Sequence, residues 1–222
     1  MSNLTLAQRN IDTYLFDFDG TLVDSMPTYI SAMLRILDDH NIQYADDIVK
    51  TITPLGVLGT ANYYIHQLGV PLELEPLINL MKQYMVDAYF YTIPAKSNVI
   101  SVLKELKSRG ASLNVLTASP HITLDACLKR LDLWNLFDHV WSCDDFHTTK
   151  ADPNIYVMAA DKLGKPVNEV LFLDDNLDAD TTAKAAGMTV CGVYDPSSAE
   201  YEQQIRAATD YYITDFSELL SL

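Results

Sequence analysis

Two aspartates separated by one phenylalanine are the residues whose spacing best suits chemistry. Asp17 and Asp19 lie in the segment DFDGT at 17–21, which follows the apolar stretch at 13–16. Side chains two apart on an extended segment point the same way, and carboxylates about 4 Å apart repel by roughly 4 kcal/mol at an effective dielectric of about 20. A cation, a proton or solvent must relieve that repulsion. The pair therefore indicates a metal site or an acid/base pair at a strand end, although Asp, Gly and Thr are also ordinary turn residues.

Three further polar groups fall where other predicted strands end or helices begin. Thr117–Ser119 offers hydroxyls and backbone N–H groups to an anion, Lys150 stands just before a predicted helix, and Asp174 and Asp175 form a second carboxylate pair. Each has an ordinary structural explanation, since a threonine or an Asp-Asp-Asn run often caps a helix and a single lysine is usually solvated. Their order along the chain, each next to the end of an element, favours one shared site.

Strand patterns alternate with helical patterns through most of the chain, and these elements must position the polar groups. The predicted strands cover 13–16, 111–116, 139–142, 170–173, 188–193 and 211–213. The predicted helices between them cover 98–109, 121–131, 153–163, 179–186 and 200–207. This alternation predicts an α/β fold with a Rossmann-like parallel sheet that is covered on both faces.

One region interrupts the alternation with helical patterns alone. The predicted helices are 26–40, 45–51, 58–68 and 73–89, divided by turns at 54–56 and 69–71. We therefore predict a catalytic core built from residues 1–24 and 94–222, with a helical cap at 25–93 inserted after the first strand. Seven tyrosines fall in this cap, and we expect most of them to pack helix against helix.

Composition and charge bound the class of protein. The 222 residues carry a formal charge of −15 and are 49% apolar, which supports a sizeable core and disfavours nucleic acid or an anionic membrane as a partner. The three cysteines form no CxxC pair, so neither a disulfide framework nor a zinc site is indicated. Residues 1–10 lack the layout of a signal peptide. We expect a cytoplasmic protein that is a monomer or a weak dimer.

Taken together, these motifs resemble the haloacid dehalogenase superfamily. Its members carry an Asp-x-Asp-x-Thr loop, a Thr or Ser, a Lys and a paired acidic motif, in the order found here. The resemblance covers essentially the whole chain and is strongest to the branch with helical caps, which includes phosphoglycolate phosphatases and β-phosphoglucomutases. It implies an enzyme that acts on a small phosphorylated metabolite with Mg²⁺ as its cofactor.

The resemblance also implies roles for particular residues. Asp17 would be the nucleophile that forms an aspartyl-phosphate, and Asp19 would be the general acid and then the general base. Thr117 and Lys150 would complete the catalytic set by binding phosphoryl oxygens. The implied metal ligands are Asp17, Asp19 through its backbone carbonyl, Asp174 and Asp175. The residues implied to bind substrate phosphate are Gly20, Thr21, Ala118 and Ser119.

Asp19 favours phosphate chemistry, because haloalkanoate dehalogenases of this superfamily lack the second aspartate. The alternative to hydrolysis is phosphotransfer like that of β-phosphoglucomutase. Such a mutase holds a sugar bisphosphate by both ends, and this cap carries only Arg35, Lys50 and Lys82 as Lys or Arg residues, with Pro120 where the mutase has a lysine. Hydrolysis is therefore the favoured reaction, with phosphoglycolate, a sugar phosphate or a nucleoside monophosphate as open alternatives for the substrate.

Two departures from the family pattern affect supporting positions. Asn154 stands where relatives often have the aspartate that anchors the lysine of the third motif. The run at 95–97 stands where a glycine often precedes the second helix of the core. We expect the first to weaken the anchoring of Lys150 and the second to alter the hinge toward the cap.

Overall fold

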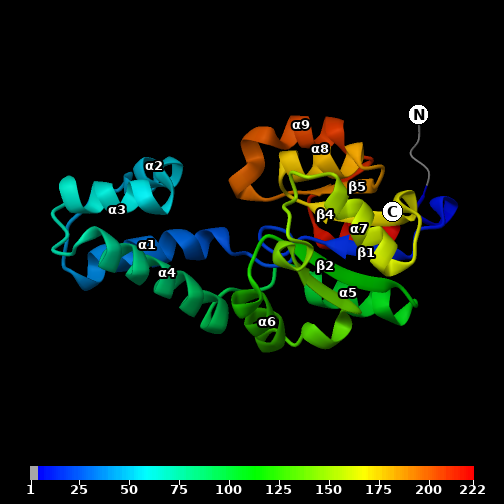
Figure 1. Ribbon diagram of the computed structural model, residues 1–222, viewed down its shortest axis with the longest axis horizontal. Helices are drawn as coiled ribbons and strands as arrows, with labels where there is room; N and C mark the ends of the chain where they lie inside the picture. Colours follow the sequence, from blue (N-terminus) through cyan, green and yellow to red (C-terminus); the bar gives the residue numbers. More distant parts are fainter. Residues whose placement is uncertain (1–4) are drawn as a thin grey trace. The chain divides into compact units, whose positions relative to one another are not determined.

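The computed structural model describes residues 5–222 and divides them into two compact units (Figure 1). One unit comprises the described residues up to Asp24 together with Pro94–Leu222, and the other comprises Ser25–Ile93. The sequence-based division falls at the same positions, and the roles of the two units as catalytic core and cap stay predictions. The start of the 1–10 segment, residues 1–4, lies outside the described residues.

The larger unit is built on one six-stranded sheet in which every neighbouring pair is parallel. The strands are β1 (Thr13–Phe16), β2 (Ser112–Thr117), β3 (His139–Ser142), β4 (Val170–Asp174), β5 (Thr189–Val193) and β6 (Tyr211–Ile213). Their order is β3-β2-β1-β4-β5-β6. The chain thus builds outward to one side of β1 and then returns to start the other side at β4. In such sheets ligands bind beyond the carboxyl ends of the strands at this switch point.

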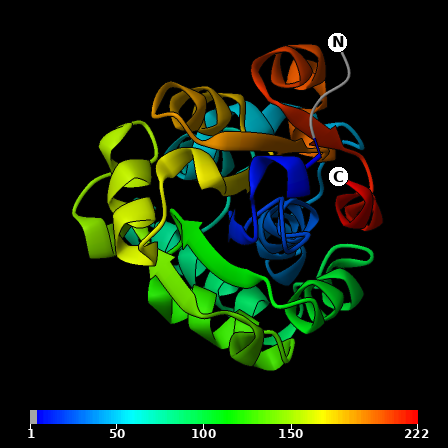
Figure 2. The same ribbon diagram turned by 90° about the vertical axis from the view of Figure 1, so that its right-hand side faces the viewer.

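Helices cover both faces of the sheet, as the strand–helix alternation predicts (Figure 2). They are α5 (Val99–Ser108), α6 (His121–Arg130), α7 (Asn154–Leu163), α8 (Leu177–Ala185) and α9 (Glu202–Ala208). Successive side chains of β1 point to opposite faces: Leu15 belongs to a buried cluster with residues of α7 and α8, whereas Phe16 packs against Phe137 and Phe216. Most element ends agree with the sequence prediction to within two residues.

The residue before α5 adopts a backbone conformation that favours glycine. Asn98 follows the 95–97 run and precedes α5 with a φ of 64°. Asparagine is one of the few residues other than glycine that enter this left-handed region readily. Residues 94–96 pair with the segment that leaves the first motif: Lys96 N donates to Leu22 O at 3.0 Å and Asp24 N donates to Pro94 O at 3.0 Å.

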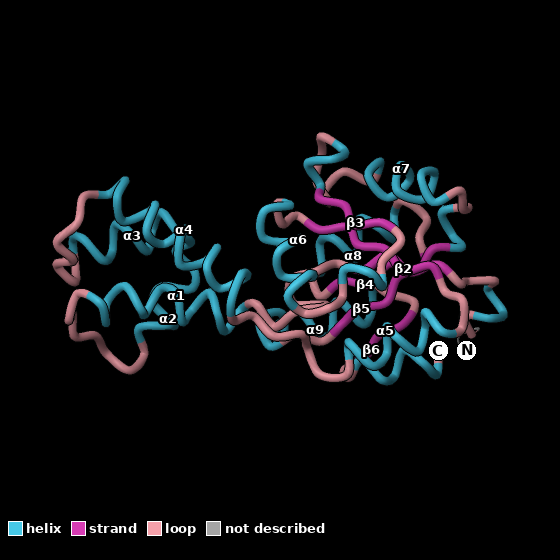
Figure 3. The backbone as a smooth tube through the Cα atoms, turned by 90° about the horizontal axis from the view of Figure 1, so that it is seen from below, coloured by secondary structure: helices cyan, strands magenta, loops and turns pink. Residues whose placement is uncertain are grey.

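The smaller unit consists of helices and loops, and in the part of the chain that the structure describes no strand falls within 25–93 (Figure 3). The helices are α1 (Met26–Asp39), α2 (Ile48–Ile52), α3 (Gly56–His66) and α4 (Leu74–Tyr91). The turn predicted at 54–56 occurs one residue earlier, as a 3-10 turn at Thr53–Leu55 that runs directly into α3. None of the helices described in either unit is both long and apolar enough to cross a bilayer.

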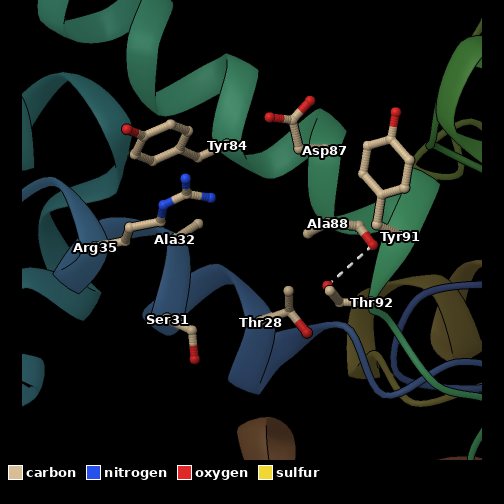
Figure 4. A pocket seen from close by; sticks show the side chains of 9 residues that line it. All are labelled: Thr28, Ser31, Ala32, Arg35, Tyr84, Asp87, Ala88, Tyr91 and Thr92. Atoms are coloured by element: carbon tan, nitrogen blue, oxygen red, sulfur yellow. Dashed lines mark hydrogen bonds between the residues drawn. The ribbon is translucent and has the colours of Figure 1, made fainter. Parts of the chain in front are cut away.

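Most tyrosines of the smaller unit pack between its helices, as expected. Tyr64 is fully buried and its hydroxyl donates to Met33 O at 3.0 Å. Tyr29, Tyr44, Tyr63 and Tyr84 pack against the same core. Tyr84 and Tyr91 also line a pocket of about 240 Å³ between α1 and α4 (Figure 4). There the Arg35 guanidinium lies 4.3 Å from the Tyr84 ring centre.

Candidate active site

The switch point of the sheet brings the first and last acidic motifs together. Asp17 directly follows β1, and its N–H donates to Leu173 O at 2.8 Å, so the pairing of β1 with β4 continues into the motif. Asp174 is the last residue of β4 and is 1% exposed. The parallel register therefore places two carboxylates, 157 positions apart in sequence, at adjacent strand ends.

Lys150 joins these two carboxylates. Its ammonium donates to Asp17 Oδ1 and, at 2.8 Å, to Asp174 Oδ2. Burial raises the pKa of Asp17 to about 7, with further increases from Asp174 and Asp19, while Lys150 acts in the opposite direction. Burial acts to lower the pKa of Lys150, but Asp17 and Asp174 outweigh it and raise that pKa. The lysine is thus held as a cation beside the two carboxylates in the site, where an anionic group would dock.

The expected effect of Asn154 on the anchoring of Lys150 stays a prediction. Asn154 is itself bonded to Asp152, whose Oδ1 accepts from both the backbone N–H and the side-chain amide of Asn154, at 3.0 and 2.9 Å. The Lys150 carbonyl also accepts a hydrogen bond from the Tyr156 hydroxyl at 3.0 Å. Tyr156 is fully buried, so the backbone of Lys150 is fixed to the core.

Asp175 completes a cluster of three carboxylates. Asp17, Asp174 and Asp175 each offer one oxygen, and these oxygens all lie within 4.8 Å of one another. Burial, followed by the charges of Asp174 and Asp17, raises the pKa of Asp175 well above its ordinary value. Thr21 Oγ donates to Asp175 Oδ1 at 3.2 Å. Lys150 contacts two of these three carboxylates, so the cluster has an excess of negative charge, and hard oxygen donors of this kind fit Mg²⁺.

Asp19 points to a different side of the site. Its Oδ2 accepts a hydrogen bond from the Ser119 hydroxyl, and the Ser119 N–H donates to Thr117 Oγ at 3.1 Å. Thr117 ends β2 and is 1% exposed. The second motif therefore fixes the orientation of the Asp19 carboxylate, a link that the sequence alone does not indicate. The part predicted for the Asp19 backbone carbonyl in metal binding stays a prediction.

A cavity of about 500 Å³ unites these groups. It is lined by Asp17, Asp19, Thr117, Ala118, Ser119, Pro120, Lys150, Ala151, Asp174, Asp175, Asn176, Asp178 and Ala179. Eight of the ten predicted site residues are among them. The other two, Gly20 and Thr21, do not line the cavity and instead contact Asp175, because a Cβ placed on Gly20 would lie 2.5 Å from Asp175 Oδ2.

Sequence reasoning missed several charged residues around this cavity. Asp180 is fully buried on α8 with neither carboxylate oxygen hydrogen-bonded, and burial raises its pKa well above the ordinary value. His121, at the start of α6, has both ring nitrogens hydrogen-bonded, to Asp125 and Asp145, at 2.8 and 2.9 Å. Lys96 contacts the first motif from 76 positions away. Only the fold reveals such contacts, since no local spacing encodes them.

Comparisons with known proteins agree with the geometry. A family model described as haloacid dehalogenase-like hydrolase matches residues 14–193. The chain is 26% identical over 219 residues to pyrophosphatase PpaX of Bacillus velezensis, a match that covers 98% of each chain. It is 28% identical over 189 residues to a phosphoglycolate phosphatase of Caulobacter vibrioides, covering 83% of this chain and 79% of the relative.

A solved structure shares the fold. The structure of a HAD family hydrolase from Deinococcus radiodurans R1, with bound phosphate and sodium, superposes with a TM-score of 0.78 at 20% identity. The match covers 95% of this chain and 94% of that chain. At this level of identity the likeness establishes the fold and leaves the reaction to be argued from the site.

Proposed function

The chain belongs to the haloacid dehalogenase-like hydrolase family, and we propose that it is a Mg²⁺-dependent phosphatase of small organic phosphomonoesters. The observation that carries this proposal is the cavity in which Asp17 and Asp19 of one segment meet Lys150 of another. Relatives named as phosphatases support the same reading. A buried carboxylate beside a cation and a second, differently hydrogen-bonded carboxylate suits phosphoryl transfer, which depends on positioning and charge neutralisation.

In the proposed mechanism Asp17 is the nucleophile. Its carboxylate oxygen attacks phosphorus, the bond from phosphorus to the leaving oxygen breaks, and an aspartyl-phosphate forms. Lys150 touches Asp17 and Asp174 and would neutralise charge on the phosphoryl oxygens. Because its ammonium also favours the ionised form of Asp17, the nucleophile is available near neutral pH.

Asp19 would act as the general acid and then as the general base. Its carboxyl group would donate a proton to the departing alkoxide and then, as a carboxylate, take a proton from the water that hydrolyses the aspartyl-phosphate. Asp19 accepts from Ser119 whereas Asp17 accepts from Lys150, and different partners of this kind suit two separate roles. Thr117 and the N–H group of Ala118 would bind phosphoryl oxygens, whereas the Ser119 N–H donates to Thr117 Oγ.

Asp17, Asp174 and Asp175 would hold the cation. Bound there, Mg²⁺ would offset the charge of the carboxylates and of the phosphoryl group. This assignment depends on the excess of negative charge where three carboxylates lie beside one contacting lysine.

The test is phosphate release from a panel of small phosphomonoesters, with inorganic pyrophosphate added because one relative is named for it. Each compound is assayed with Mg²⁺, with a chelator, and with Asp17→Asn as the blank. Asp161→Asn serves as a matched control, because this exposed aspartate lies on α7, outside the cavity lining. We expect metal-dependent release by the wild type and Asp161→Asn alone. Release that persists in Asp17→Asn, or none from any compound, would refute the proposal, and conversion of a sugar bisphosphate without release would favour the mutase.

A further inference from the structure

Lys96 is a half-buried lysine that the proposed mechanism does not use. Its side chain is 17% exposed, and its ammonium donates to three acceptors: Gly20 O at 2.6 Å, Tyr194 O at 2.7 Å and Asp195 Oδ2 at 2.9 Å. An ammonium has three N–H donors, so all of them are used within the protein. Because two backbone carbonyls and one buried carboxylate accept all three hydrogen bonds, Lys96 has a structural role and is not an ordinary solvated lysine.

The acceptors belong to two loops that flank the proposed site. Gly20 follows Asp19 in the first motif, whereas Tyr194 and Asp195 follow β5. Asp195 is 1% exposed, and its other oxygen accepts from the N–H and the hydroxyl of Ser197, at 2.9 and 2.6 Å. The loop after β5 is therefore itself anchored. Lys96 thus links the backbone of the first motif to the anchored loop after β5.

The Gly20 peptide lies directly against Asp175. Gly20 has a φ of 76°, and a Cβ in its place would lie 2.5 Å from Asp175 Oδ2. The next residue, Thr21, donates to Asp175 Oδ1. A displacement of the Gly20 carbonyl would therefore move the backbone between Asp19 and Thr21 and change how the first motif meets Asp175.

We propose that Lys96 is a positioning residue of the active site: it fixes the Gly20 carbonyl to the loop after β5 and so holds the segment with Asp17 and Asp19 against Asp175. The role in catalysis rests on the proposed function. The positioning itself does not, because it concerns contacts among residues of one unit. A misplacement of about 1 Å at reacting groups can cost about 10²-fold in rate, so a remote anchor of this kind can govern kcat.

The test uses two variants and a control. Lys96→Met keeps the aliphatic stem but removes the three donors. The double variant Lys96→Met/Asp195→Asn also removes the buried charge that the first change leaves unpaired, so it separates loss of the clamp from loss of ion pairing. Lys165→Met is the control: Lys165 pairs at 2.8 Å with Asp12, which precedes β1 at the end of the strand opposite to Asp17.

Two readouts independent of turnover are amide hydrogen exchange of the peptide 17–24 and Mn²⁺ affinity measured by electron paramagnetic resonance. We expect both Lys96 variants to exchange at least about tenfold faster in 17–24 than the wild type and to bind Mn²⁺ more weakly. In the phosphate-release assay kcat should fall about 10- to 100-fold, with KM within about threefold. Lys165→Met should match the wild type in every measurement.

Wild-type exchange, Mn²⁺ affinity and kcat in the double variant would overturn the proposal, because Lys96 would then only neutralise Asp195. Faster exchange spread equally over the β2 and β4 peptides would also overturn it, since that indicates a general loss of stability. If the wild type itself releases no phosphate, the proposed function fails. The exchange and Mn²⁺ measurements would still decide whether Lys96 holds the first motif.

Discussion

At the scale of single residues, the two carboxylates of the first motif, Asp17 and Asp19, differ in the groups that they contact. Asp17 is buried against Lys150 and Asp174, whereas Asp19 accepts from Ser119 and is more exposed. Aspartates two positions apart are thereby placed in different electrostatic environments. Carboxylates whose environments differ in this way can divide the roles of nucleophile and acid/base between them.

The acid/base role of Asp19 predicts a dependence on the leaving group. Asp19→Asn should lower kcat by about 10²- to 10⁴-fold for alkyl phosphates, because their alkoxides require a proton as they depart. The loss should be much smaller for an aryl phosphate such as p-nitrophenyl phosphate, whose leaving group is stable as an anion. Steady-state rates on matched alkyl and aryl esters check this, and an equal loss on both would remove Asp19 from the proton-transfer role.

The raised pKa of Asp17 predicts how the stability of the metal-free protein depends on pH. The folded pKa, about 7, lies above the ordinary 3.8, so between these values the native state binds more protons than the unfolded chain. Its stability must then fall as the pH rises through this window. We expect the Tm measured in chelator to decrease from about pH 5 to about pH 7.5 more steeply in the wild type than in Asp17→Asn. If the Tm of the wild type and of Asp17→Asn fell equally over this pH range, the raised pKa of Asp17 would be contradicted.

At the scale of elements, strand and helix patterns were predictable because they depend on local periodicity. All six strands occur within two residues of their expected ends, since buried parallel strands appear as short apolar runs. The site motifs were predictable for the same reason, because each lies at the end of such a run. The contacts of Lys96, the backbone conformation of Asn98 and the hydrogen bonds between Asp152 and Asn154 were not predictable. They depend on which loops the folded sheet brings together, or on one residue in an uncommon backbone conformation.

The link between α6 and the loop after β3 predicts a second, smaller effect of pH. His121 is hydrogen-bonded to Asp125 and Asp145, which raise its pKa. A raised histidine pKa contributes stability that is fully present below about pH 6.5 and is lost as the pH rises through the folded value. His121→Gln should therefore destabilise more at about pH 5.5 than at about pH 8.5, by less than about 1 kcal/mol because the ring is partly exposed.

Denaturant unfolding at the two pH values measures this effect. His66→Gln is the control, because His66 is exposed at the end of α3. An equal loss of stability at both pH values would mean that the ring packs in α6 without carrying a charge.

At the scale of the whole molecule, a strongly acidic chain concentrates three carboxylates at one point of its larger unit. Their mutual repulsion destabilises the folded state unless a cation binds there, so metal binding and folding stability should be linked. The smaller unit has its own buried core. We expect it to act as the cap that excludes water while Asp17 is phosphorylated.

This linkage predicts that Mg²⁺ raises the Tm of the wild type. At about 100 times its Kd, a ligand that binds only the native state stabilises it by about 2.7 kcal/mol. Asp175→Asn should show a smaller shift at every Mg²⁺ concentration, whereas Asp161→Asn should follow the wild-type curve. Thermal unfolding across a Mg²⁺ titration provides the measurement. An unchanged titration in Asp175→Asn would exclude Asp175 from the cation site.

The most direct measurement is capture of the phosphorylated enzyme. The protein is mixed with Mg²⁺ and the most reactive compound of the panel, quenched in acid within one turnover, reduced with borohydride and digested for mass spectrometry. We predict reduction of one carboxyl group, at Asp17, which marks the acyl phosphate formed there, and none in Asp17→Asn or without substrate. Phosphate release by the wild type with Asp17 unmodified, or a label at another residue, would contradict the assignment of Asp17 as the nucleophile.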